Sequence, residues 1–278
     1  MIHDSFDTAH RSRAAVLALA LFALTAAGVV PAGAQIPDPM FQDFEPIGSF
    51  ALSIDGEEVP NPEIYQSERA RAILVMSSRL GGPVLINLRS RRIESVGLMS
   101  LAKRQDGSID ILADAPLQPL GAFTVNAEGV TFDVRGKAVA LTNRESLTGD
   151  QSADALLEYD PAYARGAESY EPNARLVAEL EKLGTPIRVQ VFFNSKCGTC
   201  KQMVPRIIKL DRTLSSDKIE FDYYGVPDSY SGDEEMERKD VHGVPTGIVY
   251  VNGKEVGRIV GAEWRIPELA IKNLVQKS

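Results

Sequence analysis

Short apolar runs separated by turn residues fill the chain between residues 48 and 142. Apolar runs of this kind that end at Gly, Pro, Asn or Asp are typical of β-strands. The pattern predicts a small antiparallel β-rich domain, with a short helix over 64–72. Asp106-Gly107 predicts a tight hairpin turn in which both residues take positive φ. The predicted strands are 50–54, 73–76, 84–88, 93–103, 108–113, 122–125, 130–134 and 138–141.

The apolar period becomes helical after residue 173. Leu176, Val177 and Leu180 fall on one face of a helix, which Asn173 can cap and Gly184 can end. This change of period predicts that a different, helix-containing domain begins there.

Residues 148–172, between these two regions, are polar and are interrupted by Gly and Pro. They predict a linker. Its tyrosines, Tyr159, Tyr163 and Tyr170, can anchor it by partial burial against a neighbouring domain. A tyrosine-lined ligand groove is the alternative.

Another apolar run, 14–30, follows two arginines near the start of the chain and ends at Pro31 and three small residues. This layout is typical of a secretory signal peptide that is cleaved before Gln35. An uncleaved anchor is the alternative, since the run reaches the lower edge of a membrane-spanning length. The helix-breaking proline and the small residues after it favour cleavage. We therefore predict that 1–34 is a signal peptide and that the protein is extracytoplasmic.

The formal net charge of −8 excludes one broad class of function. No stretch of the sequence is dense in Lys and Arg, so the chain offers nucleic acid no electrostatic footprint. We expect no nucleic-acid partner.

Only two cysteines occur, Cys197 and Cys200, and they are separated by Gly198 and Thr199. An exported protein of this size can build a core without disulfide staples, so a close pair indicates chemistry more than scaffolding. A structural zinc site is an alternative, but only His242 could join the two cysteines outside the signal segment, and zinc takes four ligands. We predict no metal.

The cysteines lie where a strand is expected to pass into a helix. Residues 187–193 are branched and aromatic, as in a central strand, and a helix can follow from Cys197. A sulfur at a helix N-terminus faces free backbone N–H groups, which favour the thiolate, and Lys196 adds a cation beside it. Cys200, one turn deeper, can then resolve a mixed disulfide by attacking Cys197.

These residues resemble the thioredoxin family. Cys197-Gly198-Thr199-Cys200-Lys201 with Pro205 is similar to the active-site helix of the family, and 242–246 is similar to the loop that carries its cis-proline. The stretch 247–261, with an Asn-Gly turn, resembles the last two strands of the fold, and 266–276 resembles its terminal helix. The resemblance covers 173–278 and implies a mixed sheet flanked by helices.

The resemblance also implies roles for the proline loop. Pro245 should be cis, and the backbone of Val244 should present an edge to which an extended substrate can pair, with Thr246 beside it. His242 could assist proton transfer, although a plain polar neighbour is the alternative. We expect the acidic stretch 227–240 to be a solvated surface segment with a short helix over 232–239.

Two positions depart from the family pattern. Many thioredoxins keep a buried acid on the strand before the motif, where this chain has Val191. The tryptophan usual before the first cysteine is replaced by Lys196. Reduction, isomerisation and oxidation therefore all remain open, because redox poise depends on how the thiolate is stabilised.

Together these patterns predict an extracytoplasmic thiol–disulfide oxidoreductase, with a bacterial periplasm favoured by the absence of N-glycosylation sequons. The predicted regions are a signal peptide (1–34), a β-rich domain of unknown role (35–147), a linker (148–172) and a thioredoxin-like domain (173–278). Expected partners are protein thiols or disulfides and a redox protein that recycles the dithiol; no cofactor is expected. Two alternatives are a redox-sensing binding protein and a homodimer formed through the β-rich domain.

Overall fold

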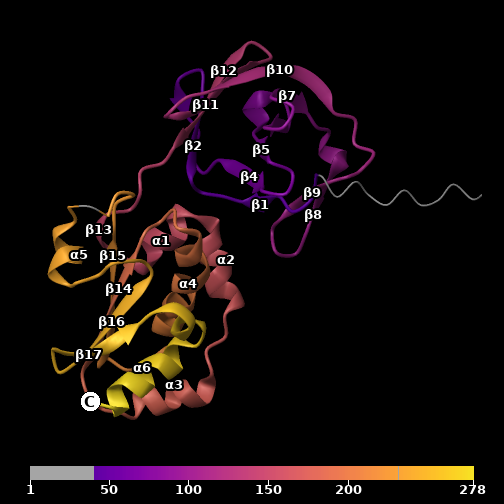
Figure 1. The fold of residues 1–278 in the computed structure, drawn as a ribbon. Helices are drawn as coiled ribbons and strands as arrows, with labels where there is room; N and C mark the ends of the chain where they lie inside the picture. The colour runs from indigo at the N-terminus through magenta and orange to yellow at the C-terminus, as the bar shows by residue number, and fades with distance from the viewer. Residues whose placement is uncertain (1–40, 231) are drawn as a thin grey trace, which may run out of the picture. The chain divides into compact units, whose positions relative to one another are not determined.

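The computed structural model describes residues 41–230 and 232–278 (Figure 1). The predicted signal peptide lies outside the described residues. Within the described part, no helix is both long and apolar enough to span a bilayer.

Residues 41–147 are rich in β-structure, and every strand pair among them is antiparallel. Ten strands follow one another in the order β1-β4-β5-β6-β7-β10-β11-β12-β2-β3, and β8 pairs with β9. The predicted antiparallel β-rich architecture is therefore confirmed. The strands are β1 (Glu45–Pro46), β2 (Phe50–Ile54), β3 (Glu57–Glu58), β4 (Glu63–Ser67), β5 (Ala72–Met76), β6 (Val84–Asn87), β7 (Arg92–Ser95), β8 (Leu101–Lys103), β9 (Ile109–Ile111), β10 (Gln118–Val125), β11 (Gly129–Val134) and β12 (Lys137–Asn143).

The predicted helix over 64–72 is wrong, because β4 and β5 form a hairpin there. These strands are buried on both faces. Ile64 belongs to one apolar cluster and Tyr65 to another, and the alternation continues with Ile73 and Leu74. Burial on both faces removes the alternation of apolar and polar residues that identifies a strand in a sequence.

The predicted strand 93–103 is also interrupted. β7 ends at Ser95, and a 3₁₀ turn (Leu98–Ser100) precedes β8. The hairpin expected at Asp106-Gly107 does join β8 and β9. Only Gly107 takes positive φ, and the Asp106 carboxylate accepts hydrogen bonds from the Ser108 amide and hydroxyl instead.

The C-terminal portion is built on a mixed five-stranded sheet in the order β13-β15-β14-β16-β17. The central strand β14 runs parallel to β15 and antiparallel to β16. The elements are β13 (Gly149–Gln151), α1 (Ala153–Tyr159), α2 (Pro161–Ser169), α3 (Ala174–Glu181), β14 (Ile187–Phe193), α4 (Gly198–Thr213), β15 (Ile219–Gly225), α5 (Glu234–Arg238), β16 (Thr246–Val251), β17 (Lys254–Ile259), a 3₁₀ turn (Gly261–Arg265) and α6 (Pro267–Gln276).

Both faces of this sheet are covered. Val189, Val191 and Phe193 of β14 pack into a cluster to which α1, α2, α3, α4 and α6 contribute. Phe192 belongs to a second cluster, which contains Met236 of α5. Because successive side chains of a strand point to opposite faces, this division places α5 on the other side of the sheet (Figure 1).

The segment expected to be a linker contains regular structure. β13 extends the sheet beside β15, and α2 packs along α4 (Figure 1). Tyr159 and Tyr163 are almost completely buried, and the Tyr163 ring meets Phe193 edge-on with the ring centroids 6.5 Å apart. Tyr163 of α2 and Leu156 of α1 belong to the same core that β14 builds.

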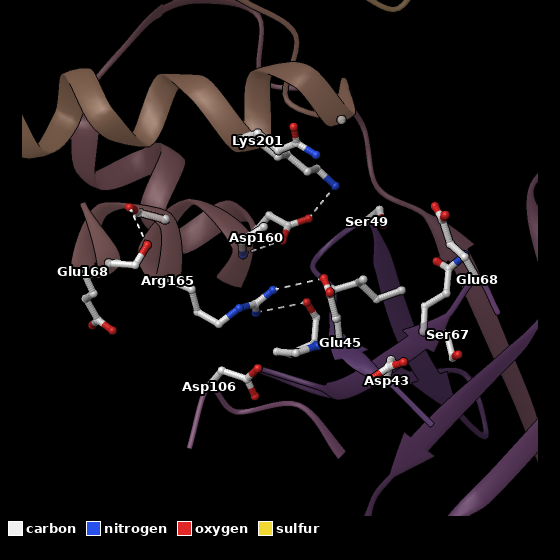
Figure 2. A pocket seen from close by; sticks show the side chains of 18 of the residues that line it. Asp43, Glu45, Ser49, Ser67, Glu68, Asp106, Asp160, Arg165, Glu168 and Lys201 are labelled. Carbon is white, nitrogen blue, oxygen red and sulfur yellow. Dashed lines mark hydrogen bonds and ion pairs between the residues drawn. The ribbon is translucent and has the colours of Figure 1, made fainter. Parts of the chain in front are cut away.

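A buried ion pair fastens α2 to α4. Asp160 caps α2 through a hydrogen bond from Ala162 N and is fully buried. Lys201, in the first turn of α4, points toward it with Nζ 2.7 Å from Oδ2 (Figure 2). Removing one partner of such a pair leaves an uncompensated buried charge, so the two helices are fixed at this point.

α2 passes close to α4 at Gly166. A Cβ atom there would lie 2.8 Å from Cβ and Cγ of Pro205. We predict that Gly166→Ala destabilises the protein, because overpacking costs about 1–3 kcal/mol whereas the helix-propensity gain is about 1 kcal/mol. The measurement is the urea midpoint of the helical signal. Glu168→Ala, an exposed change on the same helix, is the matched control, and an equal or higher midpoint for Gly166→Ala would contradict the packing described here.

Candidate active site

Cys197 lies at the N-terminus of α4, as the sequence predicted. It is the N-cap residue, and its Sγ accepts a hydrogen bond from the Cys200 amide at 3.4 Å. Its carbonyl accepts the first bond of the helix, from Lys201 N at 3.0 Å. The sulfur thus takes the place of a capping oxygen and faces the positive end of the helix dipole.

Cys200 is completely buried, whereas Cys197 is half-buried. Burial raises the pKa of the Cys200 thiol, a hydrogen bond with the Asn194 backbone opposes this, and a hydrogen bond with Cys197 adds to it. The two cysteines therefore differ in the way that an attacking and a resolving thiol differ. One sulfur is accessible at a helix tip, and the other is held back as a protonated thiol behind it.

The loop between β14 and α4 is tied down by its own polar groups. Asn194 Oδ1 accepts from the Lys196 amide at 2.9 Å, and Asn194 O accepts from the Cys197 amide at 3.1 Å. Ser195 Oγ accepts from Leu147 N at 3.0 Å, so the segment before β13 also holds the loop. The backbone that leads into Cys197 is therefore held by hydrogen bonds within the loop and by one from Leu147.

Lys196, the predicted cation beside Cys197, is paired with a carboxylate that was not predicted as part of the site. Its Nζ lies 2.7 Å from Oδ2 of Asp228, which follows β15. The Lys196 ammonium, with hydrogen bonds from Ser146 and Asn194, lowers the pKa of Asp228 to about 2. Asp228 belongs to the stretch 227–240, which was expected to be a solvated surface segment and not part of the site. No local signal marks it, because it reaches Lys196 across 32 positions of the sequence.

The proline loop lies at the same end of the sheet as the cysteines. The Val244–Pro245 peptide bond is cis. Thr246 pairs with Phe192 in the β14–β16 ladder, so residues 242–245 reach the end where β14 passes into the cysteine loop. The indole of Trp264 donates to Pro245 O at 3.1 Å, and the Thr246 hydroxyl donates to Gly243 O at 2.7 Å. Val244 is only partly buried.

The remaining predicted site residues lie at the surface. Gly198 and Thr199 are exposed on the first turn of α4. His242 is also exposed, and its imidazole lies 3.0 Å from the carboxylate of Asp240. In the part of the chain that the structure describes, no group of three or more Cys, His, Asp or Glu could hold a metal ion.

Val191, at the position of the missing family acid, is fully buried in the apolar cluster. The buried carboxylate nearest in sequence to the cysteines comes from elsewhere: it is Asp160, paired with Lys201. Burial, followed by the charges of Cys200 and Asp160, raises the pKa of the Tyr163 hydroxyl. The hydroxyl of Tyr163 donates to Asn194 O at 3.5 Å. This hydrogen bond links α2 to the loop before Cys197.

The C-terminal portion of this chain is similar to known proteins. The Thioredoxin family model matches residues 177–275. Thioredoxin-1 of Saccharomyces cerevisiae is 34% identical over 71 residues, which cover 26% of this chain and 64% of that protein. Thioredoxin of Echinococcus granulosus is 31% identical over 93 residues, which cover 34% of this chain and 78% of that protein. Among solved structures, mitochondrial thioredoxin 3 of S. cerevisiae in its oxidised form is 27% identical, with 35% of this chain and 89% of that chain covered and a TM-score of 0.27.

The match begins after the β-rich portion and after β13, α1 and α2, so these elements stand outside it. The chain spans 64% of the yeast relative and 78% of the Echinococcus relative. Through its C-terminal portion, this chain belongs to the thioredoxin family.

Proposed function

We propose that this protein is an extracytoplasmic thiol–disulfide oxidoreductase that acts on protein cysteines or disulfides through Cys197 and Cys200. One observation carries the proposal: an accessible sulfur caps α4, and a buried thiol lies one turn behind it and within hydrogen-bonding reach. Membership of the thioredoxin family supports the same reaction class.

The reaction proceeds by two displacements in line with this arrangement. The Cys197 thiolate attacks one sulfur of a substrate disulfide and forms a mixed disulfide, and the first substrate sulfur leaves as a thiolate that takes up a proton. The Cys200 thiol then loses its proton and attacks Cys197 Sγ, which releases the second substrate sulfur. Two electrons pass to the substrate, and the protein is left with a Cys197–Cys200 disulfide.

The same steps run in reverse when the substrate is a dithiol, so the direction depends on the potential of the pair. Either direction requires a thiol or disulfide protein that recycles the dithiol. The backbone of Val244, beside Pro245 and Thr246, is proposed to pair with the extended substrate while its sulfur meets Cys197. A homodimer through residues 35–147 stays a prediction.

The family's buried acid has no counterpart on β14, so removal of the Cys200 proton needs another route. Tyr163 of α2 is within electrostatic range of Cys200 and donates a hydrogen bond to Asn194 O in the loop before Cys197. On this basis we propose that the proton leaves along the α2 side.

The first test is covalent trapping. We predict that Cys200→Ala accumulates mixed disulfides with a disulfide-containing peptide or with protein substrates. In this variant Cys197 can still attack a substrate disulfide, but no second thiol is present to displace the captured partner. Non-reducing gels and mass spectrometry of the adduct give the readout. Cys197→Ala is the matched control and should trap far less; equal adducts on both variants, or none on either, would overturn the proposed function and favour a redox-sensing binding protein.

The second test compares the two thiols directly. We predict that iodoacetamide at pH 7 modifies Cys197 at least about tenfold faster than Cys200, since burial blocks Cys200 and its raised pKa keeps it protonated at this pH. Peptide mass spectrometry after brief alkylation of the reduced protein measures both rates. Similar rates for the two cysteines would mean that they do not divide the roles of attack and resolution.

The third test concerns location. The apolar run 14–30 followed by small residues supports export. We predict that the protein expressed in a Gram-negative host appears in the periplasmic fraction with Gln35 as its first residue. A full-length product that stays with the cytoplasm would contradict export.

A further inference from the structure

The charge nearest Cys197 along the chain is already balanced. Lys196 directly precedes the cysteine, and its ammonium is held by Asp228 at 2.7 Å. The ion pair is partly exposed, with side-chain accessibilities of 30% for Lys196 and 56% for Asp228. A cation that would stabilise the thiolate is thus accompanied by an anion that would disfavour it.

Asp228 is held in place by three partners from two other segments. Its Oδ1 accepts hydrogen bonds from the Ser146 hydroxyl at 2.5 Å and from Asn194 Nδ2 at 3.1 Å. Its Oδ2 accepts a hydrogen bond from Lys196 Nζ at 2.7 Å. Asn194 Nδ2 also donates to Val226 O at 3.1 Å, which fastens the cysteine loop to the end of β15. The carboxylate therefore has a fixed position relative to the loop that carries Cys197.

Ser146 lies before the residues that match the family model. Together with Leu147, which donates to Ser195 Oγ, it forms a short strap across the loop 194–196. The flank of the domain thus helps to hold Asp228 against Lys196.

Tyr230 is a neighbour that Asp228 and the dithiol have in common. The pKa of its hydroxyl is raised by burial first and then by the charges of Cys197, Cys200 and Asp228.

We propose that Asp228 is a positioning residue that sets the redox poise of the dithiol by offsetting the Lys196 charge at Cys197. The inference rests on the proposed function and adds to it the group that tunes the nucleophile. The reduced protein carries the thiolate, so any charge that stabilises the thiolate favours the reduced form and makes the pair more oxidising.

The sign of each substitution follows from this balance. Asp228→Asn removes the anion and leaves Lys196 uncompensated, which favours the thiolate. Lys196→Gln removes the cation and leaves Asp228 uncompensated, which disfavours it. With both substitutions the site is neutral again, so the double variant should return close to the wild-type value.

The experiment is the equilibrium of the full mature chain with reduced and oxidised glutathione. We expect Asp228→Asn to shift the equilibrium constant about three- to tenfold towards the dithiol, where tenfold corresponds to about 30 mV. Lys196→Gln should shift it in the opposite direction, and the double variant should fall within about twofold of wild type. The iodoacetamide rate of Cys197 at pH 7 should rise and fall in the same order. Both shifts should shrink in 1 M salt, where charges are screened beyond about 3 Å.

A matched control is Asp222→Asn, which removes the same charge from an exposed pair with Arg188 on β14; it should leave the equilibrium within about twofold. If both single variants shift the equilibrium constant in the same direction, the cause is lost loop geometry and the proposed charge balance is wrong. An equilibrium constant that Asp228→Asn leaves unchanged would also overturn the proposal. If Asp228→Asn does not fold, Lys196→Gln still decides, since it keeps the bonds of Asp228 to Ser146 and Asn194. A failure of Cys200→Ala to trap substrates would remove the proposed function but leave these equilibria to decide the role of Asp228.

Discussion

The site depends on a hydrogen bond from a backbone amide to a sulfur. The Cys200 amide donates to Cys197 Sγ at 3.4 Å, so Cys197 occupies the position of a helix cap. The same bond fixes the second cysteine one turn deeper, where it is fully buried. The accessibility of Cys197 and its proximity to Cys200 are therefore set together, because both follow from where α4 begins.

The rest of the fold keeps that point in place. β14 delivers the loop 194–196 from the centre of the sheet, and the ladder with β16 brings the proline loop to the same end. On one side, Asp160 and Lys201 fasten α2 to the first turn of α4. On the other side, Asp228 joins the loop to the end of β15. Elements outside the matched family region, α2 and the strap at Ser146, thus support the same helix tip.

Local signals in the sequence were sufficient for the parts of the site that are local. β14 spans the predicted residues 187–193, Asn173 caps α3, and Asn252 and Gly253 both take positive φ in the β16–β17 turn. The failures are non-local. Residues 64–72 were predicted to be helical because the strands β4 and β5 are buried on both faces. Their apolar side chains belong to two separate clusters, so the sequence lacks the alternation of apolar and polar residues that marks a strand. A polar segment hid α1 and α2, since their burial depends on α4. Asp228 looked like surface charge, because its partner is distant in the sequence.

The most direct test of whether the two sulfurs form one reversible couple is a redox titration of the protein against glutathione, with thiols counted by mass spectrometry. We expect the loss of two thiols in a single two-electron transition within one chain, at a potential between about −270 and −120 mV. A protein that keeps both thiols free at every glutathione ratio, or that joins them only between chains, would contradict it.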